Sequence, residues 1–338
     1  MIPDQESRFF LAFAKKKRIY AVPNPLAPIA DTHAHLLCFW DKDPVEVLVR
    51  AACAGVRQMT TIWDAAADAC DARAYADQLA AWVASARDLL AQSIEDGSAH
   101  VLPFASGREL DDPFELFGNV AFLAGVHPYG APDYDVAVHA RFLEALDQPL
   151  CIGVGEIGLD YHFDADDGIE AAPHDLQMEV MARQLEVAVA RDVPVELHLR
   201  NDCDDEARAA HADALTVLDR VGIPSAGCVL HCFGEDRATM EQFLERGCHI
   251  AFGGSATFKR NDAVREAFAA CPIDRLLFET DCPYMAPEPV RGLECEPAMI
   301  PWTVGALASD RSSRTGEGPR DIAYAVWRNS TQLFGGRR

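Results

Sequence analysis

The chain has 338 residues, of which 49% are hydrophobic, so a large buried core in one or two domains is possible. Its formal net charge of −23 disfavours non-specific binding to duplex nucleic acid, which depends on neutralising phosphates. No apolar run approaches the roughly 20 residues that a membrane span needs. The eleven cysteines are scattered without a Cys-x-x-Cys pair, as in proteins of a reducing compartment. We expect a cytoplasmic protein with no membrane partner; its oligomeric state is open, with a monomer favoured.

Short β-branched or apolar runs alternate with helical patterns along the whole chain. The runs predict eight strands, at residues 28–33, 56–62, 120–126, 151–156, 193–198, 227–231, 249–252 and 276–279. Shorter helices are predicted at 44–54, 205–221, 237–246 and 263–269, and the spacing of Met181, Leu185, Ala188 and Val189 predicts another amphipathic helix. Such alternation indicates an α/β fold with a parallel sheet, and eight units favour a (β/α)8 TIM-type barrel. A doubly wound open sheet is the alternative.

Two regions do not fit a minimal barrel, and a third segment is predicted to be a loop. Residues 63–119 hold an Ala-rich helical stretch that ends near Glu95, and we expect them to form an enlarged connection between the second and third strands. Residues 1–27 are predicted to be an extended N-terminal arm that packs on the outside of the barrel. Residues 309–319, rich in Ser and Gly, predict a flexible loop before the last helix. Residues 28–338 are then expected to be a single domain.

The most informative motif is a pair of histidines at the end of the first predicted strand. His33 and His35 are two residues apart, so on a strand their imidazoles point the same way and can hold one divalent metal ion. Two histidines at this spacing are also common on surfaces, so the pair alone is a weak signal.

Further metal-type residues end other strands. Glu156 ends the fourth strand, His198 the fifth and His231 the sixth, and Asp281 follows the eighth. Loops at this end of a barrel converge, so we expect these six side chains to meet. Six nitrogen and oxygen donors exceed one four-coordinate site and suit two divalent ions about 3.5–4 Å apart that share a carboxylate. None of the five lysines is near the end of strand three, four or five, which leaves Glu156 as the bridge.

The motifs, taken in order, resemble those of the TatD family of metal-dependent deoxyribonucleases. They begin at Asp31, Gly125, Gly155, His198, His231 and Glu279, in the segments DTHAH, GVHP, GEIGLDY, HLR, HCF and ETDCPY, and the similarity spans roughly residues 28–336. The resemblance implies an amidohydrolase-type barrel in which His33, His35 and Asp281 hold one ion, His198 and His231 the other, and Glu156 both. It also implies a phosphodiesterase or deoxyribonuclease, often a Mg²⁺- or Mn²⁺-dependent exonuclease; Zn²⁺ remains an alternative metal.

The catalytic and substrate-binding roles follow from this two-metal chemistry. Asp281 is the candidate general base, or a ligand only, and Arg200 could clamp a phosphate or pair with Glu156 or Asp160. His127 could donate to the substrate or to the leaving group, or else bond a loop carbonyl. A further pair, Tyr161 and Tyr284, could stack on a base or pack beside the site.

Three motifs differ from the family pattern near the mouth. The chain has Tyr129 after His127-Pro128, Gly-Glu at 234–235, and Leu-Glu-Cys at 293–295. Each change removes a polar or basic group, and two introduce acids. These changes and the net charge count against DNA, which is the first candidate substrate by the resemblance alone. A small amide, lactone or nucleotide is the alternative, and a catalytically silent scaffold is a third possibility.

Overall fold

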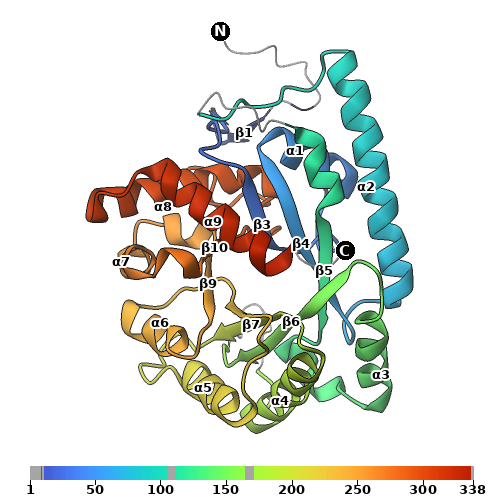
Figure 1. The fold of residues 1–338 in the computed structure, drawn as a ribbon, viewed down its shortest axis with the longest axis vertical. Coiled ribbons are helices and arrows are strands. Elements are labelled where there is room, and N and C mark those ends of the chain that lie inside the picture. The colour runs from blue at the N-terminus through green and yellow to red at the C-terminus, as the bar shows by residue number, and fades with distance from the viewer. Residues whose placement is uncertain (1–8, 10, 106–111, 164–170, 336–338) are drawn as a thin grey trace.

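A computed structural model describes residues 9, 11–105, 112–163 and 171–335. Eight parallel strands form one sheet in the order β10-β9-β8-β7-β6-β5-β4-β3, which curls into a nearly closed barrel (Figure 1). The strands are β3 (Ile29–Ala34), β4 (Val56–Asp64), β5 (Val120–Gly125), β6 (Cys151–Asp160), β7 (Val195–Arg200), β8 (Cys228–Leu230), β9 (His249–Phe252) and β10 (Leu276–Phe278). All eight predicted strands and the TIM-type barrel are confirmed.

The barrel closes between its first strand and the segment after its last. The backbone N–H of His35 donates to the carbonyl of Cys282 at 2.8 Å, and that of Asp281 donates to the carbonyl of His33 at 3.0 Å. The buried carboxylate of Asp31 accepts the backbone N–H and the hydroxyl of Thr280, at 2.8 and 2.6 Å. This seam brings the predicted residues of the first and eighth strands together.

Helices cover the outside of the barrel (Figure 1). They are α1 (Pro44–Cys53), α2 (Ala72–Glu95), α3 (Val136–Ala145), α4 (His174–Arg191), α5 (Ala209–Val221), α6 (Arg237–Leu244), α7 (Asp262–Ala270), α8 (Ile300–Thr315) and α9 (Pro319–Phe334). Asp43, Asp71, Asp135 and Asp236 cap α1, α2, α3 and α6 by accepting backbone N–H groups of the first turn. Among the described residues, none of the helices is long and apolar enough to cross a membrane.

The enlarged connection between the second and third barrel strands is confirmed. It contains α2, which has 24 residues and runs along one side of the molecule (Figure 1), and the 3₁₀ helix η1 (Pro113–Gly118). The predicted end of the helical stretch near Glu95 is also correct. The buried side chains Tyr75, Leu79 and Leu90 fix α2 against the barrel.

The N-terminal arm includes a hairpin of β1 (Ala12–Lys15) and β2 (Arg18–Ala21). The ring of Phe13 lies edge-on to Trp302 of α8 with centroids 5.9 Å apart, and Lys15 Nζ donates to the carbonyl of Pro289 at 3.0 Å. The arm therefore packs on the outside of the barrel, as predicted. The boundary between an extension at 1–27 and a single domain at 28–338 stays a prediction.

The prediction of a flexible loop at 309–319 is wrong for most of that segment, because α8 continues to Thr315 and α9 begins at Pro319. Arg311 explains the difference. Its buried guanidinium donates to the carbonyls of Phe268 and Cys271, at 3.0 and 2.7 Å, and pairs with Glu317 at 2.6 Å. These tertiary contacts outweigh the weak helix propensity of the serines.

Candidate metal centre

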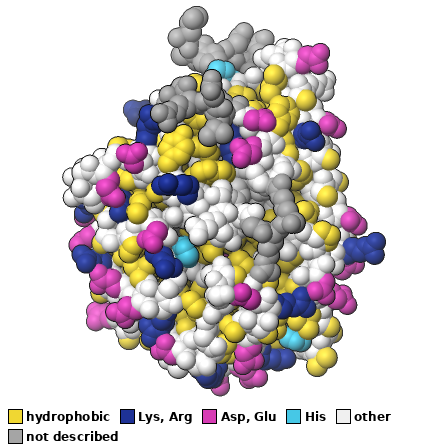
Figure 2. Space-filling model, in the orientation of Figure 1, with side chains coloured by type: hydrophobic (Ala, Val, Ile, Leu, Met, Phe, Trp, Pro, Cys, Tyr) yellow, Lys and Arg dark blue, Asp and Glu magenta, His cyan; other side chains and the backbone are white. Residues whose placement is uncertain are grey.

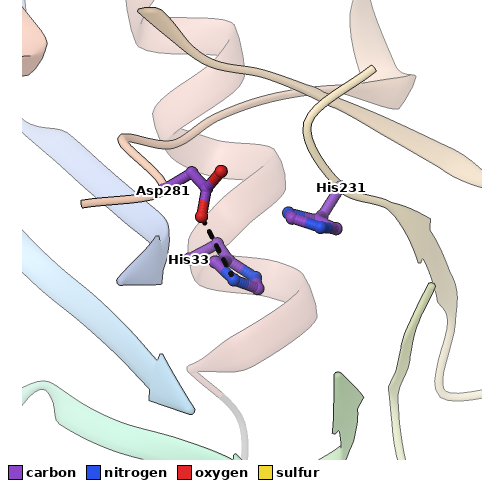
Figure 3. A group of neighbouring side chains, drawn as sticks. All are labelled: His33, His231 and Asp281. Carbon is purple, nitrogen blue, oxygen red and sulfur yellow. Dashed lines mark ion pairs between the residues drawn. The ribbon is translucent and has the colours of Figure 1, made fainter. Parts of the chain in front are cut away.

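The six predicted ligands converge at the C-terminal end of the barrel. Figure 3 shows three of them, with His33 and Asp281 in an ion pair and His231 entering from the other side of the centre. Three-residue groups whose donor atoms all lie within 4.8 Å of one another include His33, His35 and Glu156; His33, His231 and Asp281; and Glu156, His198 and His231. Their side chains are between 0% and 18% exposed, so the centre is largely shielded from water.

One half of the centre surrounds the Oε2 atom of Glu156. This atom lies 3.7 Å from His33 Nε2 and 3.8 Å from His35 Nε2. Asp281 Oδ1 completes the group, at 3.8 Å from His33 Nε2 and 3.4 Å from His35 Nε2. Two nitrogens and two carboxylate oxygens therefore surround one point.

The other half surrounds the Oε1 atom of the same carboxylate. Oε1 lies 2.6 Å from His198 Nδ1 and 2.8 Å from His231 Nε2, and these two nitrogens are 3.2 Å apart. Because each oxygen of Glu156 faces a different pair of histidines, its carboxylate lies between two donor groups.

The donor chemistry fits divalent cations. The Nε2 atoms of His33 and His35 are only 2.9 Å apart, so one proton or one cation must separate their lone pairs. Burial opposes the charge of Glu156, yet His231 and His198 hold its pKa well below the usual value. Burial likewise opposes the charge of His198, but Glu156 and Asp160 raise its pKa to about 9. Positive charge is thus favoured at the positions where a cation would lie, and the mixture of nitrogen and oxygen donors suits Zn²⁺, Mn²⁺ or Mg²⁺.

Three acidic side chains orient the histidines from behind. Glu196 hydrogen-bonds His33 Nδ1, and Asp160 Oδ2 lies 3.0 Å from His198 Nε2. Glu279 Oε1 lies 3.7 Å from His231 Nδ1. Such carboxylates fix the ring orientation and the tautomer of a metal-binding histidine.

The supporting roles of Glu196 and Asp160 were missed by the sequence analysis. Burial raises the pKa of Glu196 to about 8 and lowers that of His33 to about 3, so burial opposes charge on both partners. The sequence did contain one signal for Glu196. It is two residues before His198 on the same strand, so the two side chains point to the same face, the interior of the barrel.

Two of the predicted substrate-binding residues lie beside the His198 half of the centre. The ring of His127 is 4.4 Å from that of His198, and its Nδ1 accepts the backbone N–H of Tyr129 at 3.2 Å, which directs Nε2 away from that turn. Arg200 is 46% exposed, with its guanidinium 4.0 Å from Asp160 Oδ2, which corresponds to the pairing alternative. The exposed part of the Arg200 side chain is accessible from solvent.

The two predicted tyrosines lie in different environments. Tyr284 is 46% exposed, with its ring 6.0 Å from that of His35, so it is accessible beside the centre. Tyr161 is buried, its ring is stacked on His174 at 3.4 Å, and its hydroxyl donates to Asp213 at 2.9 Å. These contacts cover one face of the ring and engage the hydroxyl, which is the arrangement described by the packing alternative for Tyr161.

The two acids introduced by the motif differences have different partners. Glu235 Oε2 lies 3.0 Å from the guanidinium of Arg208. Glu294 Oε1 accepts the backbone N–H of Trp40 at 2.5 Å. Acidic and basic side chains are mixed over the face shown in Figure 2. Pairing with Arg208 reduces the repulsion between Glu235 and an anionic substrate.

The amino-acid sequence is similar to those of known proteins. The family model described as "TatD related DNase" matches residues 30–335. An uncharacterized metal-dependent hydrolase of Escherichia coli, YcfH, is 37% identical over 217 residues, which cover 64% of this chain and 74% of that protein. A protein of Pantoea vagans named 3′-5′ ssDNA/RNA exonuclease TatD is 30% identical over 62% of this chain and 76% of its own length.

Solved structures show the same fold. A TatD homologue of Escherichia coli, YJJV, superposes with a TM-score of 0.67 at 23% identity, over 92% of this chain and 99% of that one. A hydrolase of the TatD family from Entamoeba histolytica superposes with a TM-score of 0.63 at 17% identity, over 91% and 98% of the two chains. Because these sequence identities are low, the superpositions show a shared barrel fold and nothing further.

Proposed function

Because the chain belongs to the family of TatD related DNases, we propose that it is a hydrolase that holds two divalent cations and cleaves phosphodiester bonds in DNA. The observation that carries this proposal is the position of Glu156, whose two carboxylate oxygens face two separate pairs of histidines. His33, His35 and Asp281 would hold one cation and His198 and His231 the other, with Glu156 shared.

Bound divalent cations lower the pKa of a coordinated water and polarise a phosphoryl oxygen. Asp281 is the proposed general base. Its Oδ1 lies 3.4 Å from His35 Nε2, and the hydrogen bond with His35 lowers the pKa of Asp281 despite burial, so that its carboxylate is ionised and can accept a proton from the attacking water. Glu156 fixes the spacing of the two halves. His127, whose Nε2 is directed away from its own turn, would donate a hydrogen bond to the substrate or to the leaving oxygen.

Single-stranded DNA ends are the proposed substrate, cleaved in the 3′-to-5′ direction. The names of relatives such as the Pantoea vagans exonuclease support this choice. Two exposed side chains beside the centre support it as well: Arg200 can contact a phosphate, and Tyr284 offers a ring on which a base can stack. Stacking does not require a large basic surface and is compatible with the net charge of −23.

A substrate panel tests the proposal. Metal-loaded protein is incubated with end-labelled single-stranded DNA, a generic phosphodiester, nucleotides, and small amides and lactones. Loss of one nucleotide at a time from the 3′ end supports the exonuclease. Turnover of small substrates alone would favour the alternative hydrolase, and the absence of turnover with every metal would favour a silent scaffold.

The identity of the cations and the location of the protein are also proposals. The donors suit Mg²⁺, Mn²⁺ and Zn²⁺, and metal analysis of protein purified without chelators distinguishes them. A cytoplasmic location is supported by the eleven cysteines, all of which are free thiols in the structure. A monomer remains the favoured state, and sedimentation analysis tests it.

A further inference from the structure

A second cluster of metal-type side chains lies outside the six-residue centre. His162 follows β6, and Asp202 and Cys203 lie in the segment between β7 and α5. His162 Nδ1 lies 3.5 Å from Asp202 Oδ1 and 3.6 Å from Cys203 Sγ, and one donor atom from each residue lies within 4.8 Å of the other two. Two loops at the rim of the barrel thus bring together a nitrogen, an oxygen and a sulfur.

The two separations from His162 match those expected in a tetrahedral site. Zn²⁺ binds histidine nitrogen and carboxylate oxygen at about 2.0–2.2 Å and thiolate sulfur at about 2.3 Å. With tetrahedral angles, the nitrogen and oxygen are then about 3.4 Å apart and the nitrogen and sulfur about 3.5 Å apart. The two observed separations from His162 agree with both values, so the donors could hold such an ion with little rearrangement.

The donors are also held in place by other contacts. His162 is only 4% exposed, which fixes its ring. Asp202 Oδ1 accepts the backbone N–H of Phe163 at 3.2 Å and that of Cys203 at 2.9 Å, which joins the two loops and orients the carboxylate. On the other side of the segment, Asn201 Oδ1 accepts the N–H of Ala210 at 3.1 Å. Preorganised ligands lose less entropy when an ion binds.

We propose that His162, Asp202 and Cys203 form a separate site for a thiophilic divalent cation of the Zn²⁺ type. Thiolate donors select such ions over Mg²⁺, whereas the nitrogen and oxygen donors of the main centre do not require them. Asp202 and Cys203 are exposed, so the fourth position is open to water. The site joins the β6 and β7 loops beside Asp160, whose Oδ1 accepts the N–H of His162 at 2.9 Å and whose other oxygen contacts His198.

Cobalt binding tests this site independently of activity. Metal-free full-length protein is titrated with Co²⁺, and the thiolate-to-cobalt charge-transfer absorption is followed. The expected result is a band whose final amplitude corresponds to one thiolate-bound cobalt per chain, whatever amount the main centre also takes up, and which disappears when Zn²⁺ is added. It should be lost in Cys203→Ser and retained in Cys38→Ser, a matched variant of the other exposed cysteine. It should also persist in Glu156→Gln, in which the main centre is disrupted.

Alkylation of Cys203 provides a second measurement that does not depend on a variant. In the wild-type protein, Zn²⁺ should slow modification of the peptide that contains Cys203 and leave the rate at Cys38 unchanged. Asp202→Asn, a change at an exposed carboxylate, should weaken this protection. A band that survives in Cys203→Ser, a band lost only in Glu156→Gln, or equal alkylation of Cys203 with and without Zn²⁺ would each overturn the proposal.

Discussion

Glu196 and His33 are 163 positions apart in the sequence and share a hydrogen bond in the interior of the barrel, between the carboxylate and Nδ1. When the proton of this bond is on Nδ1, Nε2 presents its lone pair to His35, Glu156 and Asp281. One buried acid therefore determines which atom of His33 faces the centre.

The first prediction concerns this acid. Glu196→Gln should weaken metal binding by about 10–100-fold, because the ring of His33 loses the carboxyl partner that orients it. Isothermal titration with Mn²⁺ measures the change. Glu245→Gln, at an exposed position on the outside of the barrel, is the control and should bind as the wild type does. Equal affinities for all three proteins would contradict the orienting role.

The second prediction concerns the shared carboxylate. Glu156→Gln should remove most of the bound metal, since both halves of the centre lose an anionic oxygen at once. Metal content per chain, measured by inductively coupled plasma mass spectrometry, should fall well below that of the control Glu95→Gln, a change at the exposed end of α2. Retention of two ions per chain would show that Glu156 does not bridge them.

The third prediction separates catalysis from metal binding at Asp281. Asp281→Asn should lower the turnover number by about a hundredfold or more, because the amide cannot accept a proton from the attacking water. Metal content should fall less than in Glu156→Gln, since the asparagine oxygen remains near His35. Initial rates are measured at equal metal occupancy, with Asp321→Asn on α9 as the control. A near-normal rate would mean that another group is the base.

The fourth prediction concerns the seam of the barrel. Asp31→Ala removes the acceptor of two buried donors of Thr280, and should lower the free energy of unfolding by about 2–4 kcal/mol. Urea unfolding followed by circular dichroism measures the loss. Thr280→Ser keeps both donors and should cost much less. If both variants unfolded at the same urea concentration as the wild type, the seam would owe its stability to other contacts.

Much of the fold and of the centre was predictable from the sequence because both depend on local periodicity. Buried parallel strands appear as continuous apolar runs, and all eight were found within a few residues of their observed ends. His33, Glu156 and His231 were predicted to meet because each ends such a run, and strand ends of a barrel share one face.

The remaining features depend on contacts between distant segments, which local patterns do not contain. The continuation of α8 through its serines depends on Arg311 reaching carbonyls some 40 residues away. The burial of Tyr161 depends on His174 and Asp213, which belong to two different helices. The supporting role of Glu196 required knowing that β3 and β7 face each other across the interior.

The hydrogen bonds of Asp31 to Thr280 connect positions 249 residues apart. During translation β3 is among the first barrel strands to leave the ribosome, whereas its partner emerges only after most of the chain has been made. Until then this edge presents unpaired backbone groups to other nascent chains. A chain whose synthesis ends before Thr280 would therefore contain an open sheet. Such a truncated chain is expected to depend on chaperones for solubility.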